Sequence, residues 1–424
     1  MSTMSTPFRL IWFTSPALQN WWIPDNENYN WHGLGMYSDM AQVLEERGCL
    51  DALVFADAPA IPTSYGGNTD IYVKRGLEAA SMHDPLPMLS AIASMTRRMG
   101  IVATLSTTLY SPRLLAQVIA TLDHVSAGRG GWNIVTSIGN DVARNYGLDS
   151  LPPPNVRYDQ ADIFVEKVKE LFESANVGSH SSAGGLQMPP LPQKQPVIMQ
   201  AGGSDRGRDF AARHAEIVIM HRNTVADMKE FRADMVSRMK RIGRDPATCK
   251  IFFTIKIVPG RTKAEAEAID AKSKENAAGY LEYGLVNFAS RIGFDLSGLS
   301  LDEPLPEHIS SSLLGSRGVW DQYTARGAPT LREIALAEAG KESYVAIGTP
   351  GQIADQLAEA MDEIGGDGFA VRHTLHPSKV LPVVDQVIPE LQARGLLRSE
   401  YRYDIFRENL LDPNFVSHRP TDKK

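Results

Sequence analysis

The clearest chemical signal in the sequence is a Gly-Gly-Ser turn, AGGSDRGRDFAARHA, which follows an apolar strand and opens a helix. Two glycines let backbone N–H groups approach a ligand closely, and a helix N-terminus favours an anion. A phosphate therefore fits at Gly203 and Ser204, where Arg206 and Arg208 would add charge. An ordinary tight turn with Ser204 as helix cap is the alternative. The pattern is neither a dinucleotide-binding GxGxxG nor a Walker A loop.

Polar residues at the ends of predicted strands form the second group of candidates: Asp57, Thr104, Ser106, Asn133, Ser137, His221 and His373. The carboxyl ends of the strands carry the active site in a parallel barrel, so these side chains are expected to face a ligand. Asp57 suits a ligand hydroxyl or ring N–H, and Asn133 beside Trp132 suits an uncharged heterocycle. Packed or loop-bonded groups are the alternative for each of them. His373 and His376 lack a third ligand, so no metal site is predicted.

The N-terminal third is rich in aromatic residues that could form an apolar wall for a planar substrate: Trp12, Trp21, Trp22, Tyr29, Trp31, Tyr65 and Tyr72. Packing within their own loop is the alternative. GxSxG, SxxK and HExxH motifs are absent from the sequence, so hydrolysis by a familiar nucleophile or by zinc is not supported.

Short apolar strands alternate with amphipathic helices along the chain, which is typical of a parallel α/β sheet. Eight strands are predicted, near residues 8–16, 52–57, 101–107, 132–137, 196–202, 216–221, 250–260 and 367–373. Eight strands with intervening helices favour a closed (β/α)8 TIM barrel with insertions, and a doubly wound open sheet is the alternative.

We expect residues 1–424 to form one domain, with insertions at about 58–82, 175–195 and 284–343. A polar C-terminal extension is expected over 395–424. Insertions at the carboxyl ends of barrel strands commonly form binding loops. The segment from Gly284 to Ser343, together with Pro59 to Tyr72, is therefore predicted to act as a lid.

Composition narrows the class of protein further. The 424 residues include 43 Lys+Arg, 50 Asp+Glu and two cysteines, and the net charge is −7. The lack of a Lys/Arg-rich run argues against nucleic-acid binding, and the absence of a long apolar run or signal-like start argues against a membrane protein or an exported one. A cytoplasmic protein with a small-molecule partner is expected.

One long block, ATLSTTLYSPRLLAQVIATLDHVSAGRGGWNIVTS (Ala103 to Ser137), resembles the signature region of the bacterial-luciferase-like flavin monooxygenases. The similarity continues in collinear order through residues 157–166, 196–216, 347–357 and 387–401. It specifically resembles the branch that contains nitrilotriacetate, dibenzothiophene sulfone and long-chain alkane monooxygenases and pristinamycin IIA synthase.

The resemblance implies a TIM barrel that takes reduced FMN from a separate NAD(P)H-dependent flavin reductase and activates O2 on it. It also implies a homodimer or homotetramer. Carried over residue by residue, the flavin contacts would be Asp57, Thr104, Asn133, Tyr158, Gly203 and Ser204, with Ser137 as a weaker addition. Gly203 and Ser204 would hold the phosphate, and Thr104 and Asn133 would be the catalytic pair.

The chain departs from the family pattern in three places. Pro154 stands where a His is usual, Ile163 replaces an acidic residue, and the connection between Ala175 and Gln195 is short. The expected reaction is oxygenation of a small organic substrate, apolar or aromatic in view of the Trp-rich N-terminal region. A deazaflavin-dependent hydride transferase and a non-catalytic flavin-binding protein are the alternatives.

Overall fold

The computed structural model describes most of the chain. The described residues are 5–17, 31–76, 82–177, 185–272, 277–315, 317–324, 327–339 and 343–416. Trp21, Trp22 and Tyr29 of the aromatic N-terminal group lie outside them. Within the described residues, no helix is both long enough and apolar enough to cross a bilayer.

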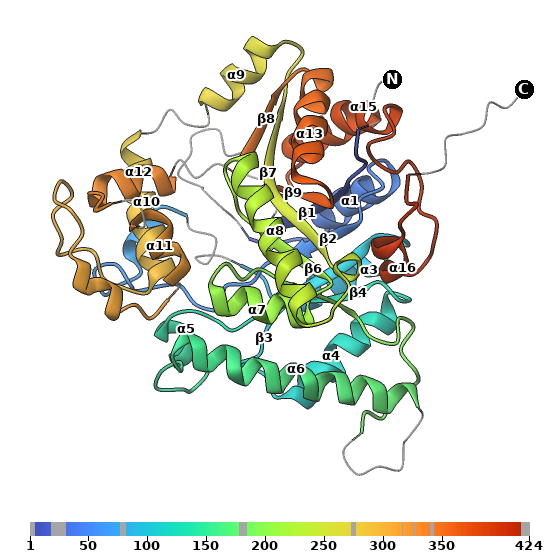
Figure 1. Cartoon of the computed structure of the whole chain (residues 1–424), viewed down its shortest axis with the longest axis horizontal. Coiled ribbons are helices and arrows are strands. Elements are labelled where there is room, and N and C mark those ends of the chain that lie inside the picture. Colours follow the sequence, from blue (N-terminus) through green and yellow to red (C-terminus); the bar gives the residue numbers. More distant parts are fainter. Residues whose placement is uncertain are drawn as a thin grey trace, which may run out of the picture.

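The core of the fold is a closed parallel barrel (Figure 1). Its strands are β1 (Arg9–Thr14), β2 (Ala52–Phe55), β3 (Gly100–Ser106), β4 (Gly130–Val135), β5 (Val197–Gln200), β6 (Ile217–Met220), β7 (Lys250–Pro259) and β9 (Gly368–Arg372). They pair in the order β6-β5-β4-β3-β2-β1-β9-β7, and pairing of β6 with β7 closes the ring. The predicted TIM barrel and its eight strands are therefore confirmed.

A ninth strand, β8 (Tyr344–Gly348), was not predicted. It pairs in parallel with the second half of β7, from Ile255 to Pro259, beyond the point where the pairing of β6 with β7 ends. Strand β8 therefore extends the barrel wall beyond the carboxyl end of β6. Only two of its five residues are buried, although its sequence, YVAIG, is apolar like those of the other strands.

Helices surround the barrel and connect its strands. They are α1 (Leu34–Glu46), α2 (Asp70–Lys74), α3 (Pro85–Ala93), α4 (Pro112–Val125), α5 (Asn140–Asn145), α6 (Pro154–Asn176), α7 (Asp205–His214), α8 (Val225–Arg241), α9 (Lys263–Lys272), α10 (Ala277–Ile292), α11 (Arg317–Thr324), α12 (Leu331–Ala339), α13 (Pro350–Ile364), α14 (Pro377–Pro382), α15 (Ile388–Ala393) and α16 (Phe406–Leu411). Pro154 is the first residue of α6, where the missing N–H of proline costs nothing, so this departure from the family has a structural role.

The interior of the barrel is identified by a cluster of alternate strand residues. Ile11, Val54, Val102 and Ile219 belong to it, whereas the residues between them pack against the surrounding helices. Two residues from α16, Phe406 and Leu410, complete the cluster. Because strand side chains alternate between faces, the residues two positions further along each strand also face the barrel axis, at its mouth.

The C-terminal extension is not the polar tail that was expected. Phe406 of α16 is fully buried, and a Cβ on Gly100 at the start of β3 would come within 2.6 Å of its ring. Helix α16 therefore plugs the floor of the barrel, at the amino ends of the strands.

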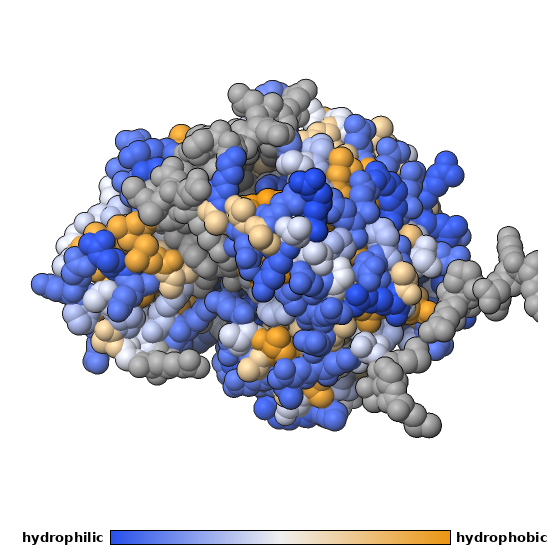
Figure 2. All heavy atoms as spheres, turned by 90° about the horizontal axis from the view of Figure 1, so that it is seen from above, coloured by the Kyte–Doolittle hydropathy of each residue, from blue (hydrophilic) through white to orange (hydrophobic). Residues whose placement is uncertain are grey.

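Residues 277–339 form most of the largest insertion. Figure 1 shows α10, α11 and α12 grouped at one side of the barrel. These helices share a hydrophobic cluster of their own, which includes Phe288, Ile292, Trp320 and Ile334. On the face seen in Figure 2, hydrophilic residues predominate and hydrophobic residues form small, separate spots.

Candidate active site

Thr104 and Asn133 form a hydrogen-bonded pair at the barrel mouth. They lie opposite each other in the register of β3 and β4, and Thr104 follows the interior residue Val102 by two positions. The Asn133 Nδ2 donates to the Thr104 Oγ1 at 2.8 Å. Both side chains are almost fully buried, and the Asn133 Oδ1 has no hydrogen-bond partner in the described chain. Trp132 points the other way, into the helix-facing core, where its Nε1 donates to the Leu105 carbonyl.

A second polar pair lies further along the same two strands. The Ser137 hydroxyl donates to the Ser106 hydroxyl at 2.7 Å, and Ser106 also accepts from the Thr108 N–H. Ser137 has a φ of 59°, in the left-handed region that a non-glycine residue seldom adopts. The chain therefore turns sharply just beyond β4, and this turn aims the Ser137 hydroxyl at Ser106.

The Gly-Gly-Ser turn has the geometry of a helix start. The Ser204 hydroxyl accepts from the Gly207 N–H at 3.1 Å and so caps α7. A Cβ on Gly207 would come within 2.8 Å of the Tyr158 hydroxyl and 3.0 Å of the Ser204 hydroxyl, so these two hydroxyls converge. Burial raises the pKa of the Tyr158 phenol, which keeps its proton for donation. Gly203 is exposed, so its backbone is accessible to a ligand.

Gln200, at the end of β5, joins these elements and was missed by the sequence reasoning. Its Oε1 accepts from the Gly202 N–H at 2.7 Å, and its Nε2 donates to the Tyr158 hydroxyl at 3.4 Å. The same rule that selected Asn133, a polar residue at the end of a barrel strand, would have found it. Gln200 fixes the approach of the chain to the turn and positions Tyr158.

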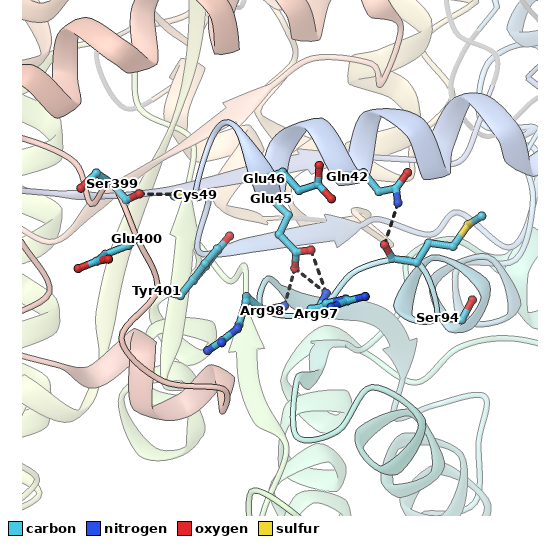
Figure 3. A pocket seen from close by; sticks show the side chains of 11 residues that line it. Gln42, Glu45, Glu46, Cys49, Ser94, Arg97, Arg98, Ser399, Glu400 and Tyr401 are labelled. Atoms are coloured by element: carbon cyan, nitrogen blue, oxygen red, sulfur yellow. Dashed lines mark hydrogen bonds between the residues drawn. The ribbon is translucent and has the colours of Figure 1, made fainter.

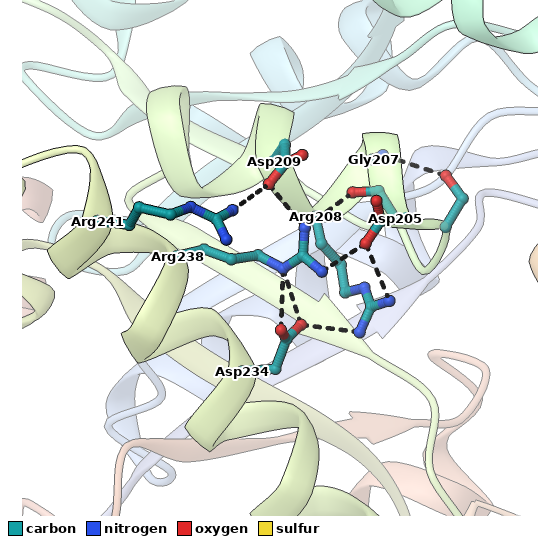
Figure 4. A network of polar contacts seen from close by, with 8 residues as sticks. Asp205, Gly207, Arg208, Asp209, Asp234, Arg238 and Arg241 are labelled. Carbon is teal, nitrogen blue, oxygen red and sulfur yellow. Dashed lines mark hydrogen bonds and ion pairs between the residues drawn. The ribbon is translucent and has the colours of Figure 1, made fainter.

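The two arginines of the first turn of α7 do not supply charge to a ligand at the Gly-Gly-Ser turn. Arg206 pairs with Asp159 and Asp162 of α6. Arg208 donates to Asp234 of α8 at 2.7 Å, within the α7–α8 network drawn in Figure 4. Both cations are thus bound to neighbouring carboxylates, and the expected contribution to a phosphate site is wrong.

The centre of that network is Arg238 of α8. It binds Asp205, Asp209 and Asp234, and these carboxylates hold its pKa above the usual value despite the opposing effect of burial (Figure 4). A hydrogen bond from Arg238 lowers the pKa of Asp205 in turn. The network fixes α7 against α8, and so holds the Gly-Gly-Ser turn in position.

Asp57 lies two residues beyond β2 and is half-buried. Its neighbour is Tyr146, at the end of α5, whose pKa is raised first by burial and then by the Asp57 carboxylate. The structure therefore places the Asp57 carboxylate near the end of α5.

The two strand-end histidines have different environments. His373 is packed against Trp12, and its Nε2 donates to the Ile257 carbonyl at 3.2 Å. Burial lowers the pKa of His373 to about 3, so it is a neutral packing residue and not an acid or base near neutral pH. His221 faces the mouth, where its Nδ1 lies 3.0 Å from the Thr254 hydroxyl.

Thr254 and Ser343 were not predicted as site residues. The Ser343 hydroxyl donates to Thr254 at 3.1 Å and lies 3.4 Å from the His221 Nδ1. Thr254 is within a long apolar strand, and Ser343 ends the large insertion, so neither position carries a local signal in the sequence.

The aromatic residues mostly pack the protein itself. Trp12 is fully buried on the helix-facing side of β1, where its Nε1 donates to the His373 carbonyl, so it does not line the mouth. Tyr72 packs with Val286 of α10, and Tyr65 joins both this contact and the insertion cluster. Trp31 lies against the His83 ring, with centroids 5.1 Å apart. The loop over 59–72 is thus joined to the insertion, as the lid hypothesis requires.

The insertion also reaches the Gly-Gly-Ser turn. A Cβ on Gly318, in the first turn of α11, would lie 3.5 Å from the Ser204 backbone nitrogen and 3.6 Å from the Gly203 carbonyl carbon. Hydrogen bonds hold the loop over 59–72 in place. Thr63 donates to Asp141, and the Gly66 N–H donates to Asp295. The insertion therefore lies against the Gly-Gly-Ser turn, and residues remote in the sequence hold the loop over 59–72.

An open surface cleft of about 810 Å³ lies elsewhere, near the amino ends of the strands (Figure 3). It is lined by the end of α1, the turn before β3 and residues 399–401. Its Glu45 carboxylate accepts from the N–H groups of Arg97 and Met99 at 2.8 Å, so it serves as a cap for that turn. Burial raises the pKa of the Cys49 thiol there to about 11, which makes it a poor nucleophile. The polar groups of the mouth are a better candidate site than this cleft.

No group of three His, Cys, Asp or Glu side chains in the described parts of the chain is arranged to hold a metal ion. Cys49 and Cys249 are both free thiols.

The comparisons with known proteins agree with the barrel fold. The family model described as luciferase-like monooxygenase matches residues 34–368. The dibenzothiophene-sulfone monooxygenase of Rhodococcus erythropolis is 34% identical over 407 residues, covering 88% of this chain and 89% of that protein. Nitrilotriacetate monooxygenase component A of Aminobacter aminovorans is 31% identical, covering 92% of each chain.

Among solved structures, a riboflavin lyase with modified FMN and riboflavin bound superposes with a TM-score of 0.84, at 26% identity and over 97% of each chain. This chain therefore belongs to the luciferase-like monooxygenase family, and it is an enzyme of the oxidoreductase class.

Proposed function

We propose that this chain is the oxygenase of a two-component system. It would take reduced FMN from a separate NAD(P)H-dependent flavin reductase and use O2 to oxygenate a small apolar or aromatic molecule. The observation that carries the proposal is the Asn133 Oδ1, a buried acceptor without a partner at the mouth of a luciferase-like barrel. A buried polar atom that lacks a partner in the protein is commonly satisfied by a ligand.

The residues present fit a flavin mononucleotide. Gly203 and Ser204 offer backbone N–H groups at the start of α7, which suits the phosphate, and Tyr158 offers a phenol beside them. Thr104 and Asn133 offer neutral hydrogen-bonding groups for the ring, with Ser137 beyond them and Asp57 at the rim. Bound reduced flavin would supply two electrons and the site that captures O2.

The chain itself would position the reactants and exclude water. Thr104 and Asn133 add no charge near the ring, and Phe13 at the end of β1 is a half-buried apolar surface facing the same mouth. The insertion over 284–343 and the loop over 59–72 would form the lid, since water exclusion protects a reactive oxygen species from side reactions. We further propose a cytoplasmic homodimer or homotetramer.

An anaerobic titration of the protein with oxidised and with reduced FMN tests the cofactor site. Ser204→Asp should weaken binding by on the order of 1,000-fold, because two like charges about 4 Å apart repel by roughly 4 kcal/mol at a protein surface. Aspartate is itself a good helix cap, so α7 should persist. Tyr158→Phe should cost about tenfold, the value of one hydrogen bond to a charged group.

Ser111→Asp is the matched control. Ser111 caps α4 in the same way, with its hydroxyl accepting from the Leu114 N–H, and it is exposed. This variant should bind FMN as tightly as the unaltered protein. Absence of binding of either redox form, or full binding by Ser204→Asp, would refute the proposed function. Mixing the protein with FMN, a flavin reductase and NADH under O2 then separates an oxygenase from a flavin carrier or a hydride transferase.

A further inference from the structure

Two buried cations lie at the floor of the barrel, at the end opposite the mouth. Arg9 is the first residue of β1, and Lys250 is the first residue of β7. Arg9 is 5% exposed and Lys250 is 9% exposed. Charged side chains are seldom buried to this extent unless a group of opposite charge accompanies them.

Strand geometry directs both side chains to the barrel axis. Ile11 and Phe252, two positions further along β1 and β7, belong to the interior cluster, so Arg9 and Lys250 point inward below them. Strand β9 lies between β1 and β7, and its residue Gly368, which pairs with both Arg9 and Phe252, has no side chain. Neighbouring strands are about 4.8 Å apart, so β1 and β7 are about 10 Å apart, a gap that two long side chains can bridge.

The carboxylates near these cations are bound to other residues. Each is paired with a different arginine: Asp51 with Arg398, Asp367 with Arg232, and Asp412 with Arg402. Arg9 donates to the Asp412 carbonyl and lies over the Phe415 ring, but its Nε is a buried donor without a partner in the described chain. Within the described residues, Arg9 and Lys250 are therefore left without an ion pair.

The two cations lie within electrostatic range of each other. Burial lowers the pKa of the Lys250 amine, and the Arg9 cation lowers it further, against the opposing effect of the Asp367 carboxylate. Burial also lowers the pKa of Arg9, but an arginine keeps its proton in a protein, so this charge stays in the floor. A negative charge placed between Arg9 and Lys250 would stabilise both.

We propose that the floor of the barrel binds one small inorganic anion, of the size of chloride, between the Arg9 Nε and the Lys250 amine. The space is small, because a Cβ on Gly368 would come within 2.6 Å of both the Phe252 ring and the Arg9 carbonyl oxygen. The anion would bind only the folded chain, where the ends of β1 and β7 meet. It would stabilise the barrel independently of any ligand at the mouth.

The dependence of stability on chloride tests the proposal. Urea unfolding is followed by circular dichroism at increasing sodium chloride, with sodium gluconate added to keep the ionic strength constant. An ion that binds only the folded state multiplies the ratio of folded to unfolded protein, by about 30-fold at 300 mM chloride for a dissociation constant of about 10 mM. The slope of the logarithm of this ratio against the logarithm of chloride concentration should approach one.

Lys250→Met keeps a long side chain and removes the charge, so the slope should fall to near zero. Lys167→Met is the matched control. It removes an exposed lysine that pairs with Glu170 on α6, and it should keep the slope of the unaltered protein.

Bromide provides a test that needs no variant. It replaces chloride in sites of this kind and scatters X-rays anomalously, so crystals of the unaltered protein soaked in sodium bromide should show an anomalous peak in contact with the Arg9 Nε. If Lys250→Met fails to fold, this peak decides between the outcomes.

A chloride-dependent slope that is lost in Lys250→Met and kept in Lys167→Met, with bromide at Arg9, would support the anion site. Equal stability in chloride and gluconate would overturn it, and so would a slope retained in Lys250→Met or the absence of bromide at Arg9. None of these measurements involves flavin, so the proposed function stands or falls separately.

Discussion

The two ends of the barrel differ in the charge of their buried polar side chains. At the floor, the amino ends of the strands are closed by charged residues, among them Arg9, Asp51 and Arg398, each about 95% buried or more. At the mouth, the most deeply buried polar side chains, Thr104 and Asn133, are neutral. The floor thus uses charge to attach the C-terminal segment, whereas the deeply buried pair of Thr104 and Asn133 at the mouth carries no charge.

The contacts of the floor residues explain this attachment. Arg398 binds the Asp51 carboxylate and donates to the Asn409 carbonyl at 3.1 Å, and Arg9 donates to the Asp412 carbonyl. Asp51 also accepts from the Leu10 N–H. Strands β1 and β2 are therefore tied to α16 by groups that depend on one another. These contacts of the floor therefore serve the stability of the fold.

The largest expected effect is at the floor. Arg398→Ala leaves the Asp51 carboxylate buried without its cation, which should cost about 3 to 5 kcal/mol of the free energy of unfolding. Urea unfolding followed by circular dichroism measures this loss. Lys167→Ala, which removes the exposed ion pair of Lys167 with Glu170, is the control and should change stability little. A loss below 1 kcal/mol in Arg398→Ala would show that the floor is not held by this pair.

A smaller, pH-dependent effect is expected at His373. Its pKa is lowered to about 3 by burial, so the folded protein keeps it neutral while the unfolded chain takes up a proton below pH 6.5. The stability that His373 confers is complete above pH 6.5 and is lost as the pH falls toward 3, by about 3 kcal/mol at pH 4.

His373→Leu should remove this part of the pH dependence. The difference in unfolding free energy between the variant and the unaltered protein, measured at pH 8 and again at pH 4, isolates the contribution of His373 from that of other groups. The variant should gain relative to the unaltered protein on acidification. A difference that stays constant with pH would mean that His373 is charged in the folded state or that its burial is incomplete.

The sequence predicted the mouth better than the floor, and the reason is physical. Strands of a parallel barrel are nearly continuous apolar runs, so their ends are visible and the polar residues Thr104 and Asn133 stand out there. The resemblance to a known family then added Tyr158, which no strand pattern marks. The contact between Thr104 and Asn133 depends on the register of β3 and β4, which the sequence did not specify.

The segment that closes the floor was wrongly predicted to be a polar extension. The apolar pattern of α16 is short, and the residues it packs against are distant in the sequence. Helix α16 has only six residues within a charged segment, and its role depends on Phe406 and Leu410 reaching the interior cluster formed by distant strands. The buried arginines Arg9 and Arg398 look like surface residues until their partners are known. The sites of Thr254 and Ser343 likewise depend on where the insertion returns to the barrel.

The smallest expected effect concerns the mouth, and it is opposite in sign to that at the floor. Replacing both partners of a buried hydrogen bond by apolar groups of similar shape is nearly neutral or stabilising. Thr104→Val combined with Asn133→Leu also removes the unpaired Asn133 Oδ1, so the double variant should unfold with an unchanged free energy or one higher by about 1 kcal/mol. It should also bind FMN more weakly, because it lacks the hydrogen-bonding groups proposed for the ring. Urea unfolding and the anaerobic titration measure the two effects on the same sample. If the double variant instead lost 3 kcal/mol or more, these residues would support the fold as Arg398 does, and the contrast between the two ends of the barrel would fail.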